Sequence, residues 1–151
     1  RVLLATGHPT GLLAHYTAIA RALQSAGSEL LTPLDDVFVR RDERGRPRGL
    51  RFTDGVACLF DGAALLHTHR SVYMEAMLDA LDSRRPDLVV GDHGMAGAAV
   101  ERGIPTLSVA DVNDPALPVA QVRRRTDGVL CIDDNLPPRL FVPVTEAMLR
   151  W

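Results

Sequence analysis

The chain has 151 residues, of which 46% are hydrophobic and 24% are charged, a composition that suits one globular domain with a sizeable core. The formal net charge of -2 gives no electrostatic case for nucleic acid or an anionic bilayer as the main partner. All 17 of the Lys+Arg residues are arginine, which excludes a phosphate-loop lysine, a Schiff-base lysine and a lysine general base.

The two cysteines, Cys58 and Cys131, lie far apart in the sequence and form no Cys-x-x-Cys pair. We interpret both as small buried apolar residues in a reducing compartment. No apolar run approaches the roughly 20 residues that span a bilayer, and no signal peptide is recognisable, so we expect a cytoplasmic protein without a transmembrane segment. The start at Arg1, inside a strand, and the end at Trp151 suggest that sequence is missing at both ends.

The first half of the chain predicts strands and a helix, followed by an irregular region. An apolar run over residues 1–6 predicts a buried strand, and apolar residues spaced by one turn over 12–26 predict a helix packed on a sheet. Residues 29–34 predict a second short strand. Residues 40–49 are charged and rich in glycine and proline, which indicates a loop. That loop is either solvated or turned toward an acidic ligand or a membrane.

The second half predicts alternating elements, after one strand or hairpin within residues 50–60. Helices are expected over 63–81 and 95–102, and strands over 88–90, 105–110 and 128–132. This alternation, without hairpin signals of the Asn-Gly kind, predicts an α/β fold with a Rossmann-like open parallel sheet and helices on both faces. We expect a single domain over residues 1–136, with 137–151 as a tail or connection toward a missing second domain.

Two predicted strands end in polar residues that belong together. His8 follows the first strand and Asp92 follows the strand at 88–90. Because the carboxyl ends of parallel strands share one edge of a sheet, these side chains can meet, and a histidine held by a carboxylate is a general base near neutral pH. The alternative is structural: His8 satisfies local backbone at the helix entry, and Asp92 caps the next helix.

The remaining histidines offer a weaker case for a metal. His67 and His69 fall on the helix predicted over 63–81, where they point to different sides and cannot bind one ion from that helix alone. A second set could hold a divalent metal in the manner of phosphoesterases, because it combines hard carboxylates with an imidazole. Its members are Asp92, His93, Asp111 and Asp114. We expect neither a metal nor another cofactor there.

The order of motifs resembles the N-terminal, acceptor-side half of GT-B glycosyltransferases. The motifs are Gly7-His8-Pro9 opening a helix, then Pro86-Asp87 before a strand that ends at Asp92, and then Gly103-Ile104-Pro105 before another strand. The resemblance covers residues 1–34 and about 84–110, and the middle of the chain matches poorly. In inverting members the histidine removes a proton from the acceptor hydroxyl while the aspartate holds its ring, which implies these roles for His8 and Asp92.

The resemblance implies sugar transfer from a nucleotide-sugar donor to a small-molecule or lipid-linked acceptor. The donor would bind a C-terminal domain or a partner subunit. We expect the acceptor near the strand ends, contacted by Thr10, Gly11, His15, His93 and Asp111. Two alternatives remain open: a non-catalytic Rossmann-like module that binds a small anion, and a metal-dependent hydrolase.

Overall fold

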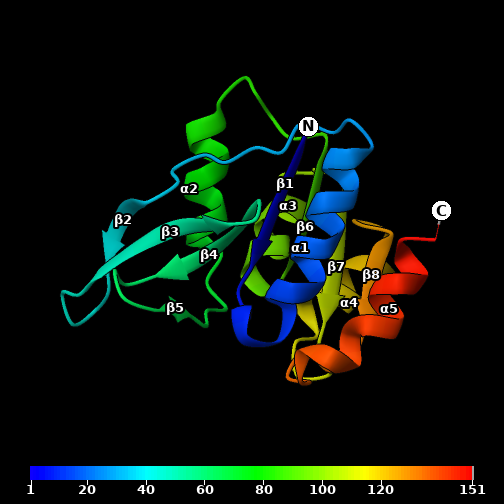
Figure 1. Cartoon of the computed structure of the whole chain (residues 1–151). Helices are drawn as coiled ribbons and strands as arrows, with labels where there is room; N and C mark the ends of the chain where they lie inside the picture. The colour runs from blue at the N-terminus through cyan, green and yellow to red at the C-terminus, as the bar shows by residue number, and fades with distance from the viewer. Residues whose placement is uncertain (151) are drawn as a thin grey trace.

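The structure is a computed structural model that describes residues 1–150. It contains an eight-stranded sheet in the order β2-β3-β4-β1-β6-β7-β8, with β5 paired to β4 (Figure 1). The strands are β1 (Val2–Thr6), β2 (Val37–Arg41), β3 (Pro47–Thr53), β4 (Val56–Phe60), β5 (Leu65–Leu66), β6 (Leu88–Asp92), β7 (Thr106–Ala110) and β8 (Gly128–Cys131). The helices are α1 (Pro9–Ser25), α2 (Val72–Leu81), α3 (His93–Glu101), α4 (Ala116–Val122) and α5 (Val142–Met148), with a 3₁₀ turn η1 (Pro138–Phe141).

The strands β4, β1, β6, β7 and β8 are parallel and form the centre of the fold. β1 and β4 are buried throughout, as expected of parallel strands covered on both faces. One face packs against α2 and α3 around Met74 and Met95, and the other packs against α1 and η1 around Tyr16 and Phe141. The predicted α/β fold with helices on both faces of a largely parallel sheet is therefore confirmed.

The other side of the sheet is antiparallel. Of the two alternatives expected within residues 50–60, one strand or a hairpin, the structure has the hairpin, formed by β3 and β4, whereas the pairings of β2 with β3 and of β4 with β5 were not predicted. Strands β2, β3, β4 and β5 are joined by hairpins. The charged segment expected as a loop over 40–49 is the end of β2, a tight turn and the start of β3. Asp42 organises this turn by accepting hydrogen bonds from the amides of Arg44 and Arg46, at 2.9 Å each. The strand expected over 29–34 is reduced to a bridge between Val2 and Leu30.

The helix predicted over 63–81 begins later, at Val72. Leu65 and Leu66 instead pair with β4 as the short strand β5, and the following residues run on without helical structure as far as the start of α2. The prediction failed because apolar residues of β5 happen to continue the helical spacing of α2. This shift changes the directions in which His67 and His69 point.

The end of the chain packs on the rest of the domain. Phe141 is buried against α1, so residues 138–148 pack on the domain, whereas Trp151 lies outside the described residues.

Cys58 is buried as expected, but Cys131 is exposed because it ends β8, the last strand at this side of the sheet. None of the helices in residues 1–150 has the length and apolarity required to cross a membrane.

Candidate active site

The carboxyl ends of the parallel strands carry the polar residues of the candidate site. His8 follows β1, Asp92 ends β6 and leads directly into His93, Asp111 follows β7, and Asp134 follows β8. These strands are neighbours in the sheet, in the order β1-β6-β7-β8. These side chains therefore lie at the edge where open α/β sheets bind their ligands, which makes this edge the candidate site.

Four of the five histidines gather at this edge. The ring centroids of His69 and His93 are 3.9 Å apart, those of His67 and His69 are 4.7 Å apart, and those of His8 and His67 are 4.5 Å apart. Burial, and then the neighbouring rings of His8, His69 and His93, lower the pKa of His67 from its usual value. This lowered pKa favours the neutral form of His67, the form of imidazole that binds metals.

His67 and His69 reach the cluster because their segment is held against two glycines. The amide of Thr68 donates a 2.8 Å hydrogen bond to the carbonyl of Gly7. A Cβ at Gly7 would lie 2.2 Å from the carbonyl oxygen of Thr68, and a Cβ at Gly94 would lie 2.3 Å from that of His69, so only glycine permits this approach. The expectation that both rings diverge on a helix was wrong, because the segment is not helical.

His93 lies between two carboxylates. Its Nδ1 is 3.0 Å from an oxygen of Asp114, and its Nε2 is 2.9 Å from Oδ2 of Asp134. The first contact is a hydrogen bond, which assigns the proton to Nδ1 because an ionised carboxylate only accepts. The second contact lacks hydrogen-bond geometry, so Nε2 and Oδ2 are both buried without a hydrogen-bond partner among residues 1–150. Two electron-rich atoms thus face each other in a buried position.

His8 is held by backbone rather than by Asp92. Its Nδ1 lies 2.8 Å from the carbonyl oxygen of Asp134, which can only accept, so Nδ1 carries the proton and the neutral ring has a free lone pair at Nε2. The hydrogen-bonded dyad expected between the His8 ring and Asp92 is not formed in this structure. The reason is that β8 brings its own loop to the ring, and the carbonyl of that loop occupies the position assigned to the carboxylate.

Asp92 instead fastens the loop after β1. Its carboxylate accepts 2.6 Å hydrogen bonds from the hydroxyl of Thr6 and the amide of Gly7, while its side chain makes no capping hydrogen bond to α3. Burial raises the pKa of Asp92 to about 6, against the opposing effects of the Thr6 hydroxyl, the nearby His93 and the Gly7 amide. Asp92 is fully buried and acts as an internal support of this edge.

A second cluster adjoins the histidines. Carboxylate oxygens of Asp111, Asp133 and Asp134 lie within 4.8 Å of one another, as do nitrogen atoms of His67, His69 and His93. The 2.9 Å contact between His93 and Asp134 joins the two groups. A cavity of about 320 Å³ opens over them, lined by His8, His67, His69, His93, Asp111, Asn113, Asp114, Asp134 and Asn135.

Other residues expected at the acceptor site lie elsewhere or are already engaged. The ring of His15 is buried between α1 and α5, where its Nδ1 is 2.7 Å from the hydroxyl of Thr145. The amide of Gly11 donates to the carbonyl of His8, so it is not free for an anion. Thr10 is exposed at the start of α1 and is not among the residues that line the cavity.

Sequence reasoning missed His67, His69, Asp133 and Asp134 as site residues. Asp133 and Asp134 follow the last parallel strand, so the rule that singled out Asp92 and Asp111 also applied to them. The His67-Thr68-His69 spacing carries a second signal, because alternate residues of an extended segment face the same side. The incorrect helix prediction concealed that signal.

The comparison with known proteins identifies the class. The model of a family described as Phosphatase matches residues 1–151. The chain belongs to this phosphatase family. It is 40% identical over 153 residues to the phosphatase SCO2771 of Streptomyces coelicolor, an alignment that covers 99% of the chain and 56% of that relative. The chain thus spans little more than half the length of the curated relative it matches, and no solved structure matches it.

These matches overturn the glycosyltransferase reading. The family match covers the whole chain, and the relative is named a phosphatase. The predictions of sugar transfer, of a nucleotide-sugar donor and of a sugar acceptor were therefore wrong. The GT-B resemblance was misleading because its motifs occur in Rossmann-like folds of many functions. These motifs are a strand followed by Gly-His and a helix, and Gly-Ile-Pro before a strand. Of the interpretations from the sequence, the metal-dependent hydrolase fits the matches better.

Proposed function

We propose that this chain hydrolyses phosphomonoesters with the help of a divalent cation bound by His67, His69, His93 and Asp134. The observation that carries the proposal is the buried pair formed by Nε2 of His93 and Oδ2 of Asp134, 2.9 Å apart without a hydrogen bond. Two lone pairs at this separation repel each other unless a positive charge lies between them. Ligand atoms that share one ion, each at about 2.0–2.2 Å from it, lie roughly 3 Å apart.

The donor set supports a first-row transition metal. Imidazole nitrogens suit ions such as Zn²⁺, and carboxylates extend the choice toward Mn²⁺. The hydrogen bond from Nδ1 of His93 to Asp114 orients the ring with Nε2 toward Asp134, as carboxylates do behind many metal-binding histidines. The acidic residues Asp111 and Asp133 lie close enough to Asp134 to take part in a second ion. Mutual proximity of two such ions is common in phosphatases.

A bound cation would also offset the negative charge of the cavity. Its lining includes the carboxylates of Asp111, Asp114 and Asp134 but no arginine, so by itself it repels a phosphate dianion. Bound divalent ions supply Lewis-acid stabilisation of phosphoryl oxygens and lower the pKa of water. We infer that the excess of carboxylates serves to hold positive charge, which then attracts the substrate.

The protein's own groups would position the phosphoester and transfer protons. Asn113 and Asn135 line the cavity and can donate side-chain hydrogen bonds to phosphate oxygens. The neutral ring of His8 offers Nε2 as a proton acceptor or, when charged, as a donor to the leaving oxygen, because its Nδ1 is fixed on the Asp134 carbonyl. His8 thereby keeps a proton-transfer role, directed at a phosphoester instead of an acceptor hydroxyl.

The proposal is tested by phosphatase assays on the purified chain. We expect hydrolysis of p-nitrophenyl phosphate that is lost on dialysis against a chelator and restored by Zn²⁺ or Mn²⁺. His93→Gln and Asp134→Asn should each abolish metal binding and lower kcat/KM by at least about 100-fold. His15→Gln is the matched control, because His15 lies outside the cluster and glutamine can still bond to Thr145. Activity that survives chelation, or that both ligand variants retain, would contradict the proposal.

A further inference from the structure

A second cavity, of about 470 Å³, adjoins the candidate active site. The side chain of His67 lines both this cavity and the cavity over the histidine cluster. Leu59, Leu66 and Tyr73 form its apolar part. Its charged lining comes from β2, the β2–β3 turn and β3, and from a residue just before α2: Arg40, Asp42, Glu43, Arg44, Arg46, Arg48 and Arg70.

The arginines in this cavity outnumber the carboxylates, five to two. Oδ2 of Asp42 accepts from both Arg46 Nε at 2.9 Å and Arg48 Nη2 at 2.7 Å, so two guanidinium groups share one carboxylate. Arg48 depends more strongly on the Asp42 carboxylate than Arg46 does, because only 9% of its side chain is exposed and a buried charge needs a partner. Arg70 pairs with Glu43 at 2.6 Å. A net positive charge remains.

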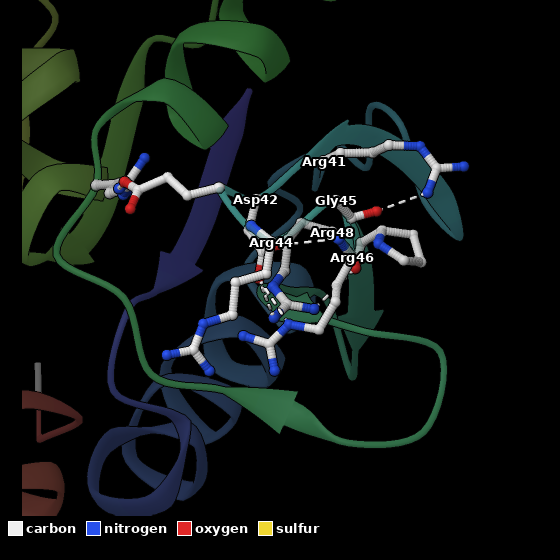
Figure 2. A network of polar contacts seen from close by, with 9 residues as sticks. Arg41, Asp42, Arg44, Gly45, Arg46 and Arg48 are labelled. Carbon is white, nitrogen blue, oxygen red and sulfur yellow. Dashed lines mark hydrogen bonds and ion pairs between the residues drawn. The ribbon is translucent and has the colours of Figure 1, made fainter.

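Arg40 and Arg44 both line this cavity. Figure 2 shows the guanidinium groups of Arg44, Arg46 and Arg48 gathered on one side of the turn, whereas Arg41 extends away from them. In the described part of the chain, Arg40 and Arg44 have no ion pair. Each guanidinium carries five N–H donors, and arginine is the side chain best suited to bind phosphate and carboxylate groups in two-pronged fashion.

We propose that this cavity binds a second anionic group of the substrate, so that the preferred substrates are small phosphomonoesters bearing a further phosphate or carboxylate. This inference rests on the proposed function for the assignment of the scissile phosphate. The scissile group occupies the cavity over the histidines, the carbon framework passes His67 and contacts Leu66 and Tyr73, and the second anion meets Arg40 and Arg44. The charged turn is thus a specificity element.

The test compares substrates that differ only in the second anion. For the wild-type chain we expect kcat/KM to be about 10- to 100-fold higher for a hexose bisphosphate than for the corresponding monophosphate, as one or two charge-assisted hydrogen bonds would give. 3-Phosphoglycerate against glycerol phosphate reports whether a carboxylate suffices. The double variant Arg40→Gln/Arg44→Gln should lose the preference while its kcat/KM for glycerol phosphate stays within about threefold. Both side chains are exposed and unpaired, so the fold should be retained.

Arg41→Gln is the matched control beside the same turn, because Arg41 is exposed, points away from the other guanidinium groups and donates a hydrogen bond to the carbonyl of Gly45. It should keep the preference, measured at about 0.15 M salt where distant charges are screened. The inference is overturned if the wild type shows no preference, if the double variant keeps it, or if Arg41→Gln loses it equally.

Calorimetry separates this inference from the proposed function. The chain treated with a chelator should bind both the hexose bisphosphate and the monophosphate through the arginines, and the double variant should bind each of them at least about tenfold more weakly. If no phosphoester is hydrolysed but this difference in affinity persists, the proposed function fails and the anion site stands. If hydrolysis occurs but both ligands bind equally well to wild type and variant, the anion site fails alone.

Discussion

His93 is the residue on which the candidate site depends, and its two ring nitrogens have different partners. Nδ1 bonds to Asp114 and Nε2 faces Asp134, so the ring connects the loop after β7 with the loop after β8. The sequence analysis placed His93, Asp111 and Asp114 at one edge from the strand ends alone. It could not show which nitrogen faces which carboxylate, because that depends on the turn of each loop.

The first prediction concerns Asp114, a positioning residue. Asp114→Asn keeps an acceptor for Nδ1 of His93 but removes the charge that makes the ring a stronger donor to a cation. We expect the affinity for Zn²⁺ to fall about 10- to 100-fold, with the melting temperature of the metal-free protein nearly unchanged. Competition with a chelating dye measures the affinity, and Asp87→Asn, on an exposed carboxylate far along the sheet, is the control. Unchanged affinity would show that Asp114 does not support a metal ligand.

The second prediction concerns the two thiols. Burial, with a smaller effect of Asp92, raises the pKa of Cys58 to about 12, whereas Cys131 is exposed. The raised pKa reduces the thiolate of Cys58 roughly a thousandfold at any pH below its usual value near 9. Iodoacetamide at pH 7.5 should therefore modify Cys131 alone in the native chain and both thiols in urea, as mass spectrometry of the peptides would show. Rapid labelling of native Cys58 would contradict the buried position.

Among the elements, the segment that carries His67 and His69 shows most clearly where sequence patterns fail. Apolar residues at Leu65 and Leu66 belong to a strand, yet they fit the helical spacing that α2 continues. The contacts of Thr68 with Gly7 and of His69 with Gly94, both distant in the chain, favour the extended structure, and the local pattern contains no information about them. The parallel strands β1, β6 and β7 were predictable because each is a largely apolar segment that a helix follows.

The third prediction tests how that segment is held. Gly94→Ala should displace it, because the new Cβ would lie 2.3 Å from the carbonyl oxygen of His69 and 2.5 Å from the amide nitrogen of Ser71. We expect at least a tenfold loss of metal affinity and of kcat/KM. Gly97→Ala in the same helix is the control, since nothing lies within 4 Å of its Cβ, and it should stabilise the protein by up to about 1 kcal/mol. Equal behaviour of the two variants would show that the segment is not held by Gly94.

Across the whole molecule, the proposed ligands come from three separate parts of the sheet. His67 and His69 follow β5 on the antiparallel side, His93 opens α3 at the centre, and Asp134 follows β8 near the opposite edge (Figure 1). A bound cation would join these parts and therefore stabilise the fold as a whole. Composition correctly indicated one domain with a sizeable core, but the function was mistaken because Rossmann-like motifs define a scaffold and not a reaction.

The fourth prediction follows from this arrangement. A ligand at 100 times its dissociation constant stabilises the native state by about 2.7 kcal/mol, which for a chain of this size corresponds to a rise of roughly 5–10 °C in melting temperature. Scanning calorimetry should show this rise with Zn²⁺ in the wild type and little in Asp134→Asn. An equal shift in that variant would indicate that the ion binds elsewhere.

X-ray absorption spectroscopy of the Zn²⁺-loaded chain is the most direct test of the central claim, that a cation is bound by His67, His69, His93 and Asp134. We expect one tightly retained ion with a coordination shell of nitrogen and oxygen atoms, in which the scattering pattern of three imidazole rings is visible. His67→Ala should remove one ring from that pattern. An ion coordinated by oxygen alone, or a chain that retains no ion after desalting, would contradict the account.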